Sequence, residues 1–245
     1  ICEGGAIQLG TTTTGQGYSY QWTGPDGYFS DVANPAQITN VKSEKQGKYQ
    51  LVISVGNCKS DTATTNVIIL PTPPRPEITG ESIYCEGSTF SLVVNNLPIQ
   101  EKYTWYKDGE KFRVTNENSL EILNVATSAS GLWQVVVESN GCASDTSEAK
   151  LISIDNLSVI GAANTGPACE GDTIDLSATF VPNSTYKWSG PGSYTATGQF
   201  VKAPAKSGEY FVTITTTTGC ENVTSTSVEV NVAPVITALS NNSTL

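Results

Sequence analysis

Apolar and polar residues alternate in short stretches along most of the chain. An alternation with a period of two places the apolar side chains on one face of an extended segment, and it therefore predicts a half-buried β-strand. Turn residues separate these stretches at a spacing of roughly 8–12 residues, which is typical of an all-β sandwich. No segment shows sustained helical periodicity. The clearest alternation lies at Phe90, Leu92 and Val94 and again at Trp133, Val135 and Val137.

The composition agrees with an all-β chain. The 245 residues include 31 Thr and 25 Ser, and Thr favours strands because its branched Cβ fits a pleated surface. The 22 Gly and 12 Pro residues supply turns. The pair Asp108-Gly109 predicts a tight hairpin, because both residues tolerate the positive φ of a primed turn.

Three copies of one pattern follow each other along the sequence. Each copy opens with Cys-Glu-Gly, holds Tyr-x-Trp at its centre, continues with Gly-x-aromatic and closes near a second Cys. A self-similarity with this period indicates tandem domains. The predicted domains are repeat 1 (1–72, without its first strand), repeat 2 (73–154), repeat 3 (155–232) and the start of a fourth repeat or a tail (233–245). Prolines between residues 71 and 76 predict a semi-rigid spacer after repeat 1.

The pattern resembles the immunoglobulin-like fold. The stretch from Trp105 to Gly109 resembles strand C and its hairpin, and Gly131-Leu132-Trp133 resembles the start of strand F. The resemblance implies three tandem immunoglobulin-like β-sandwich domains with a shared set of core positions. These core positions are Trp22, Trp105, Trp188, Tyr49, Trp133 and Tyr210. The second Cys lies further along strand F than in antibody domains, so a bridge through the core is absent and Leu51, Val135 and Val212 take its place.

The motifs are also similar to one narrower group. Cys-Glu-Gly, the run Trp22-Thr23-Gly24-Pro25-Asp26-Gly27 and the closing Gly-Cys resemble immunoglobulin-like repeats of secreted surface proteins in gliding, Bacteroidetes-type bacteria. Such repeats often precede a gliding-motility-type C-terminal sorting domain. The resemblance implies export, a cell-surface location and a role in adhesion or spacing, and it implies no ligand.

The six cysteines predict disulfides and an oxidising compartment. If every repeat uses the same pairing, the within-repeat set follows, with one disulfide in each domain. These predicted pairs are Cys2–Cys58, Cys85–Cys142 and Cys169–Cys220. The alternative joins Cys58 to Cys85 across the linker and leaves Cys2 and Cys220 unpaired. No Cys-x-x-Cys motif is present, so zinc binding is disfavoured.

Charge and composition exclude several classes of function. The net charge is −10, which disfavours nucleic acid and anionic membranes as partners, and no apolar run is long enough for membrane insertion. The chain has no His, which excludes Ser-His-Asp catalysis and His-ligated metal sites. Carboxylate- or Lys-based chemistry needs no His, but a sandwich of this size has little room for a catalytic cleft. We therefore expect no enzyme activity, no catalytic residue and no cofactor. The nearest candidates for calcium binding are Asp26 with Asp31, Asp172 with Asp175, and Asp155, but turns and caps account for all of them.

Two kinds of candidate surface site remain. Tyr28, Phe29 and Tyr194 follow the central turns and could contact a ligand, although packing inward is the alternative for each ring. Thr62 and Thr173 fit the Asp-Thr-apolar pattern of O-glycosylation that the resemblance implies.

The sequence as a whole predicts a non-catalytic segment of an extracellular adhesin or surface stalk. Its partner would be a cell-surface or extracellular protein or a glycan. The alternative is an accessory module of a secreted polysaccharide-degrading enzyme, such as a carbohydrate-binding module.

Overall fold

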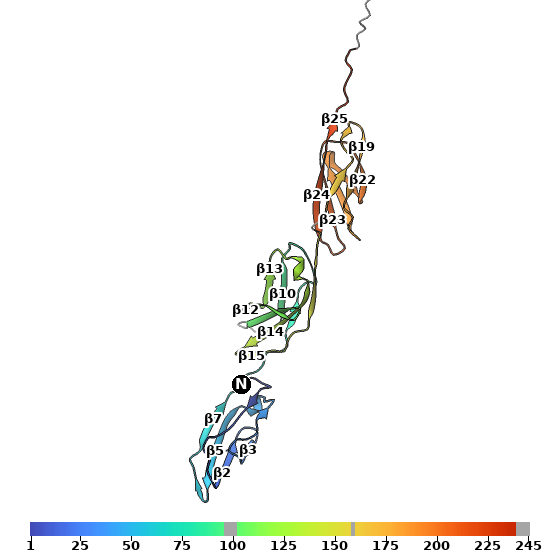
Figure 1. Cartoon of the computed structure of the whole chain (residues 1–245). Helices are drawn as coiled ribbons and strands as arrows, with labels where there is room; N and C mark the ends of the chain where they lie inside the picture. Colours follow the sequence, from blue (N-terminus) through green and yellow to red (C-terminus); the bar gives the residue numbers. More distant parts are fainter. Residues whose placement is uncertain (96–101, 158–159, 239–245) are drawn as a thin grey trace, which may run out of the picture. The chain divides into compact units, whose positions relative to one another are not determined.

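The structure is a computed structural model that describes residues 1–95, 102–157 and 160–238 (Figure 1). The described residues form β-strands and three short 3₁₀ turns, η1 (Ser43–Lys45), η2 (Thr127–Ala129) and η3 (Pro191–Ser193). No helix in this part of the chain has the length and apolar character needed to cross a membrane. The predicted fourth-repeat segment 233–245 forms no strand up to residue 238, and the rest of it lies outside the described residues.

The chain divides into two compact units. Unit 1 holds repeat 1 and much of repeat 2, and unit 2 holds the remainder of repeat 2 together with repeat 3. Unit 1 comprises Ile1–Gly80, Ser91–Glu121 and Gly131–Leu151, and unit 2 comprises Glu81–Phe90, Ile122–Ser130 and Ile152–Leu245.

Repeat 1 forms two antiparallel sheets. One sheet pairs β1 (Ala6–Ile7) with β4 (Ile38–Thr39). The other has the order β3-β2-β5-β6, with β7 beside β5. The strands of this second sheet are β2 (Tyr18–Thr23), β3 (Phe29–Ser30), β5 (Gly47–Val55), β6 (Cys58–Lys59) and β7 (Ala63–Val67).

Repeat 2 repeats this arrangement with longer strands. One sheet has the order β13-β10-β8, and the other has the order β12-β11-β14-β16-β9, with β15 beside β14. The predicted hairpin is present, because Asp108 and Gly109 both have positive φ between the paired residues Lys107 and Glu110. The strands are β8 (Glu77–Thr79), β9 (Ile83–Cys85), β10 (Phe90–Asn95), β11 (Lys102–Lys107), β12 (Glu110–Thr115), β13 (Ser119–Ile122), β14 (Gly131–Ser139), β15 (Cys142–Ala143) and β16 (Lys150–Asp155).

Repeat 3 has the same two kinds of sheet. One sheet has the order β17-β19-β22 and the other β21-β20-β23-β24, while β18 pairs with β25 in parallel. The strands are β17 (Ala162–Asn164), β18 (Ala168–Cys169), β19 (Thr173–Ala178), β20 (Thr185–Gly190), β21 (Tyr194–Thr197), β22 (Phe200–Pro204), β23 (Gly208–Thr215), β24 (Glu221–Val228) and β25 (Val230–Asn231).

Alternation along the central strands builds the core of each repeat. Every second side chain in the middle of these strands is buried, and its neighbours are more exposed. The buried residues are Trp133, Val135 and Val137 on β14 and Tyr210, Val212 and Ile214 on β23. The expected core aromatics are all buried, and only Trp22 retains as much as 5% exposure. Leu51, Val135 and Val212 are buried at the positions where antibody domains hold their second cysteine. Apolar packing therefore replaces the core disulfide in these sandwiches.

The corner aromatic differs between the repeats. The hydroxyl of Tyr49 donates to the carbonyl oxygen of Lys45 at 3.0 Å, and that of Tyr210 donates to Pro204 at 2.9 Å. Trp133 has no hydroxyl, and its ring instead meets Phe112 edge-on with centroids 4.9 Å apart. The corner hydrogen bond is thus formed in repeats 1 and 3, and an aromatic contact occupies the corner of repeat 2.

Candidate functional site: the disulfide junctions between repeats

Two disulfides join consecutive repeats. Cys2 of repeat 1 is bonded to Cys142 of repeat 2, with Cα atoms 5.6 Å apart. Cys85 of repeat 2 is bonded to Cys220 of repeat 3, with Cα atoms 5.5 Å apart. Cys58 and Cys169 are free and exposed. The predicted within-repeat pairs, one disulfide per domain, are therefore wrong, and so is the alternative pair Cys58–Cys85.

Strand geometry explains why the two cysteines of one repeat do not meet. Cys2 forms a parallel bridge with Leu70, near the end of β5 where Gly47 pairs with Val67. Cys58 pairs with Val55 at the opposite end of the same strand. Eight residue steps of an extended strand span roughly 27 Å, whereas disulfide-bonded Cα atoms lie about 4.4–6.8 Å apart. The first cysteine of a repeat instead lies where the chain leaves for the next one.

The same separation holds in repeat 3. Cys169 pairs with Asn231, which follows the end of β24 where Gly208 pairs with Val228. Cys220 precedes the other end of β24, where Thr215 pairs with Glu221. Each repeat therefore carries one cysteine toward the next repeat and one toward the previous repeat.

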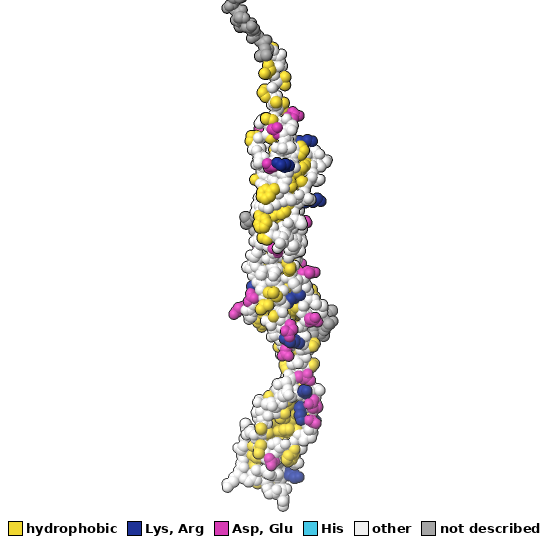
Figure 2. Space-filling view, turned by 90° about the vertical axis from the view of Figure 1, so that its right-hand side faces the viewer, with side chains coloured by type: hydrophobic (Ala, Val, Ile, Leu, Met, Phe, Trp, Pro, Cys, Tyr) yellow, Lys and Arg dark blue, Asp and Glu magenta, His cyan; other side chains and the backbone are white. Residues whose placement is uncertain are grey.

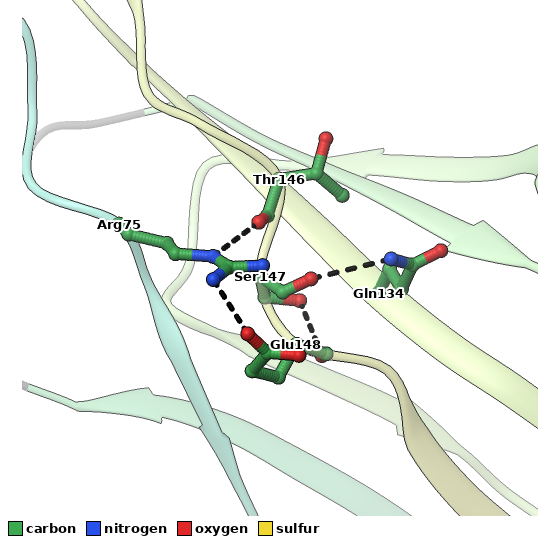
Figure 3. A network of polar contacts seen from close by, with 5 residues as sticks. All are labelled: Arg75, Gln134, Thr146, Ser147 and Glu148. Atoms are coloured by element: carbon green, nitrogen blue, oxygen red, sulfur yellow. Dashed lines mark hydrogen bonds and ion pairs between the residues drawn. The ribbon is translucent and has the colours of Figure 1, made fainter.

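An arginine of the first linker binds the segment of repeat 2 that follows the bonded cysteine (Figure 3). Arg75 Nε donates to the carbonyl oxygen of Thr146 at 2.7 Å, and Arg75 Nη1 lies 2.5 Å from the carboxylate of Glu148. Thr146 follows the bonded Cys142 by four residues, so both contacts lie on the segment that continues from the cysteine. The linker and the disulfide therefore reach the same loop of repeat 2.

Buried serines hold that loop in place. Between β15 and β16 the chain leaves the regular ladder, and serine hydroxyls replace its hydrogen bonds. Ser147 Oγ accepts from the backbone N–H of Val135 at 3.0 Å and donates to the carbonyl oxygen of Glu148 at 2.9 Å. Gln134 Nε2 donates to the Ser147 carbonyl oxygen at 3.2 Å (Figure 3). Arg75 thus contacts a segment whose polar groups are already satisfied.

The second junction uses other residues for the same purpose. Thr218 Oγ1 donates to the carboxylate of Asp155, the residue that pairs with Cys85. Asn222 Nδ2 donates to the carbonyl oxygen of Leu157 at 2.8 Å, so the hairpin that carries Cys220 also binds the linker. Both junctions therefore combine a disulfide, the peptide linker and polar contacts to the linker.

Of the three candidate ligand contacts, two pack against a corner tyrosine and one is exposed to solvent. Tyr28 meets Tyr49 edge-on with centroids 5.4 Å apart, and Tyr194 meets Tyr210 in the same way at 5.7 Å. Burial raises the pKa of the Tyr28 phenol, against a hydrogen bond with Ser30 that lowers it. Burial also raises the pKa of Tyr194. Both rings thus pack on the corner tyrosine, whereas Phe29 is 62% exposed.

The acidic side chains considered for calcium have other contacts. Asp26 pairs with Lys45 at 2.6 Å, Asp155 accepts from Thr218, and Asp172 accepts from the backbone N–H of Cys169 at 3.1 Å. Within the described ranges, no three metal-ligating side chains cluster. On the face in Figure 2, acidic side chains are interspersed with basic ones.

The candidate O-glycosylation residues are accessible. Thr62 and Thr173 are both exposed, the first between β6 and β7 and the second at the start of β19.

Sequence reasoning considered Asp155 only for calcium, and it missed the other residues that complete the junctions, namely Arg75, Thr146, Glu148, Thr218 and Asn222. One signal was present, because Ser-Asp-Thr follows the second cysteine by two residues in both repeat 1 and repeat 2. Such a short polar run is typical of a loop, and its serine proves to be the residue that fixes the loop next to the bonded Cys142.

Comparisons with known proteins bear on the fold. No family model matches the chain, and no curated protein matches it. A three-domain immunoglobulin segment of titin, in an E-to-A mutated variant, is similar with a TM-score of 0.51 at 12% identity, covering 94% of each chain. The ectodomain of mouse nectin-like molecule 4 gives a TM-score of 0.40 at 12% identity, covering 97% of this chain and 98% of that one. A marsupial T cell receptor gives 0.42 at 11%, covering 92% and 97%.

The titin match carries the structural conclusion. It covers nearly the whole chain and places it in the tandem immunoglobulin-like β-sandwich fold. At this identity the similarity concerns the fold alone and carries no information about function.

Proposed function

We propose that this chain is a non-catalytic, extracellular spacer in which disulfides restrain the angles between consecutive immunoglobulin-like repeats. The observation that carries the proposal is the pairing of Cys2 with Cys142 and of Cys85 with Cys220. A disulfide inside a repeat stabilises that repeat, whereas a disulfide between repeats adds a second covalent link to the junction. This arrangement suits a segment whose task is to hold other domains apart.

The contacts around each disulfide support this role. A single flexible linker leaves two domains free to rotate about it. At the first junction the linker residue Arg75 is also tied to Thr146 and Glu148, on the segment that continues from the bonded Cys142. At the second junction Asn222 holds the linker carbonyl of Leu157. The disulfide opposes rotation at each junction, and at the second junction rotation would also break the hydrogen bond from Thr218 to Asp155 at the end of β16.

The cysteine chemistry supports an extracellular location. Disulfides persist in oxidising compartments and are rare in the cytosol. The motif resemblance adds a surface protein of gliding, Bacteroidetes-type bacteria, where the repeats would form part of a stalk or adhesin.

A binding role for the same segment would involve exposed aromatic side chains. Among the three predicted ligand contacts, Phe29 is the one whose ring faces solvent. A glycan array with this chain and with Phe29→Ala tests this role, and a loss of binding in the variant would support it.

Small-angle scattering tests the spacer role on the oxidised chain. Three sandwiches in a line should give a maximum dimension on the order of 100 Å, from strands of about 3.3 Å per residue. A compact globule of this length would measure roughly 50–60 Å. The smaller value would overturn the proposal.

Scattering also tests restraint at the junctions, by comparing the oxidised chain with the double variant Cys2→Ser/Cys142→Ser. We expect the scattering profile of the oxidised chain to fit a single arrangement of the repeats and that of the variant to require a mixture of arrangements. Identical profiles would show that the disulfide does not restrain the junction.

A further inference from the structure

The two free cysteines occupy positions that are disulfide-bonded elsewhere in the same chain. In both observed junctions, the cysteine of a Cys-Glu-Gly loop is bonded to the cysteine that follows the hairpin turn of the next repeat. Cys169 lies in a Cys-Glu-Gly loop and Cys58 follows a hairpin turn. The two free thiols are therefore the two complementary halves of one junction.

The Cys169 loop has the backbone geometry of the two bonded loops. Cys2, Cys85 and Cys169 each form a parallel pair with the last strand segment of their repeat, at Leu70, Asp155 and Asn231. The next residue, a glutamate, donates its N–H to that partner's carbonyl oxygen at 2.9, 2.9 and 3.1 Å. The loop is therefore already formed at Cys169 without a bonded partner.

The Cys58 hairpin likewise matches the bonded hairpin at Cys142. Both turns have two residues, with Val55 opposite Cys58 and Ser139 opposite Cys142. Two residues further on, a serine hydroxyl accepts a backbone N–H of the neighbouring strand at 3.0 Å and donates at 2.8 Å to the next carbonyl oxygen. The hairpin of repeat 1 therefore has the same local structure as the bonded hairpin of repeat 2.

Exposure distinguishes the free hairpin from the bonded ones. The bonded hairpin cysteines Cys142 and Cys220 are 0% and 2% exposed, and the bonded loop cysteines Cys2 and Cys85 are partly buried. Cys58 and Cys169 are exposed. A repeat docked at either position would cover the thiol as the observed junctions do.

We propose that Cys58 of one copy of this chain forms a disulfide with Cys169 of a second copy, which continues the observed repeat-to-repeat pairing between molecules. The contact is head-to-tail and does not close on itself, so it generates linear oligomers. The inference rests on the geometry of the loops and hairpins, and it is independent of the spacer role.

The bond forms by two exchange steps when glutathione disulfide is the oxidant. The Cys58 thiol loses its proton, and the thiolate attacks glutathione disulfide to give a mixed disulfide and one reduced glutathione. The Cys169 thiolate then attacks the Cys58 sulfur and releases a second glutathione. Two electrons pass from the two thiols to the oxidant, and two protons are released to the thiolates of glutathione or to solvent.

Single variants test the pairing without disturbing the observed disulfides. Cys58→Ser leaves Cys169 as the free thiol, and Cys169→Ser leaves Cys58. One variant is labelled with ¹⁵N, so that intact mass distinguishes the heterodimer from each homodimer. The variants are incubated separately and mixed in a buffer of reduced and oxidised glutathione, which allows wrong pairs to exchange.

We expect the mixture to give heterodimer in about tenfold excess over either homodimer, which is about five times the statistical ratio. A linked pair of tryptic peptides 49–59 and 151–187 identifies the bond, and the unmodified chain should give a ladder of oligomers. A statistical mixture, with twice as much heterodimer as either homodimer, would overturn the proposal. A Cys58–Cys169 bond within monomeric chains would overturn it as well.

Discussion

Gly24 lies against the ring of Tyr49, so closely that a Cβ on this glycine would fall 2.4 Å from Cδ1 of the tyrosine. Gly190 has the same relationship with Tyr210, at 2.5 Å. The glycine of the central Gly-Pro motif has no side chain. The end of β2 in repeat 1 and the end of β20 in repeat 3 can therefore approach the corner tyrosine. In repeat 2, Lys107 and Asp108 stand at these positions and a tryptophan occupies the corner.

Replacing Gly24 with Ala should destabilise repeat 1. The added methyl group has to displace a fully buried ring, and overpacking of this kind costs about 1–3 kcal/mol. Denaturant unfolding of the oxidised chain measures the change. Gly161→Ala is the matched control, because its Cβ would meet its nearest neighbour, Thr179 Oγ1, at an ordinary 3.5 Å. Equal stabilities for the two variants would show that the ring moves aside at no cost.

Peptide mapping of the chain isolated as a monomer, under non-reducing conditions, should find two linked pairs and two free thiols. Each cysteine lies in a different tryptic peptide, so every possible pairing gives a distinct mass. We expect residues 1–42 linked to 114–150 and residues 60–102 linked to 207–245, with alkylated thiols at Cys58 and Cys169. A link between 1–42 and 49–59 would restore pairing within the repeat and remove the basis of the proposed junctions.

The sequence predicted the strands and the core because both depend on local alternation. Trp105, Val135 and Tyr210 are buried because side chains alternate in direction along a strand, and their neighbours are more exposed because they point the other way. This alternation can be recognised from neighbouring residues alone. The Asp108-Gly109 hairpin is also local, because two residues determine the turn.

The disulfide pairing was not predictable in the same way. Spacing along the chain identified which cysteines are equivalent, but it did not say at which end of the sandwich each one lies. That information comes from the register of β5 against β7 and of Cys2 against Leu70. The contacts of Arg75 depend in turn on long-range packing, since its partner Thr146 lies 71 residues further along the chain.

The ion pair between Arg75 and Glu148 should contribute little to the stability of the oxidised chain. Both side chains are largely in solvent, with 52% and 85% exposure, and exposed pairs typically contribute about 0–1 kcal/mol. A double-mutant cycle with Arg75→Ala and Glu148→Ala measures the coupling directly. A coupling energy well above 1 kcal/mol would mean that the surrounding loop shields the pair from water.

Alkaline pH should destabilise the repeats that carry a corner tyrosine. Burial raises the pKa of Tyr28, Tyr49 and Tyr194, so the folded chain keeps these phenolic protons at a pH where the unfolded chain has lost them. This stabilisation is complete below the unfolded pKa of about 10 and is lost as the pH rises through the folded values.

The measurement is the free energy of unfolding against pH, in a Cys58→Ser/Cys169→Ser background that prevents thiol exchange. Tyr28→Phe removes one of these phenols, so the free energy of unfolding should fall less steeply with pH above about pH 10. An unchanged slope would assign the alkaline effect to other groups.

The interleaving of the two disulfides has a consequence for cleavage of the backbone. The loop closed by Cys2–Cys142 overlaps the loop closed by Cys85–Cys220, so every peptide bond from residue 2 to residue 220 lies inside at least one of them. A protease that cuts the proline-rich segment around Pro73 therefore leaves both pieces covalently joined. Bonds within each repeat would have left that segment as a single severable connection. With the observed pairing, an exposed linker can be nicked in an environment rich in proteases while the three repeats stay attached to one another.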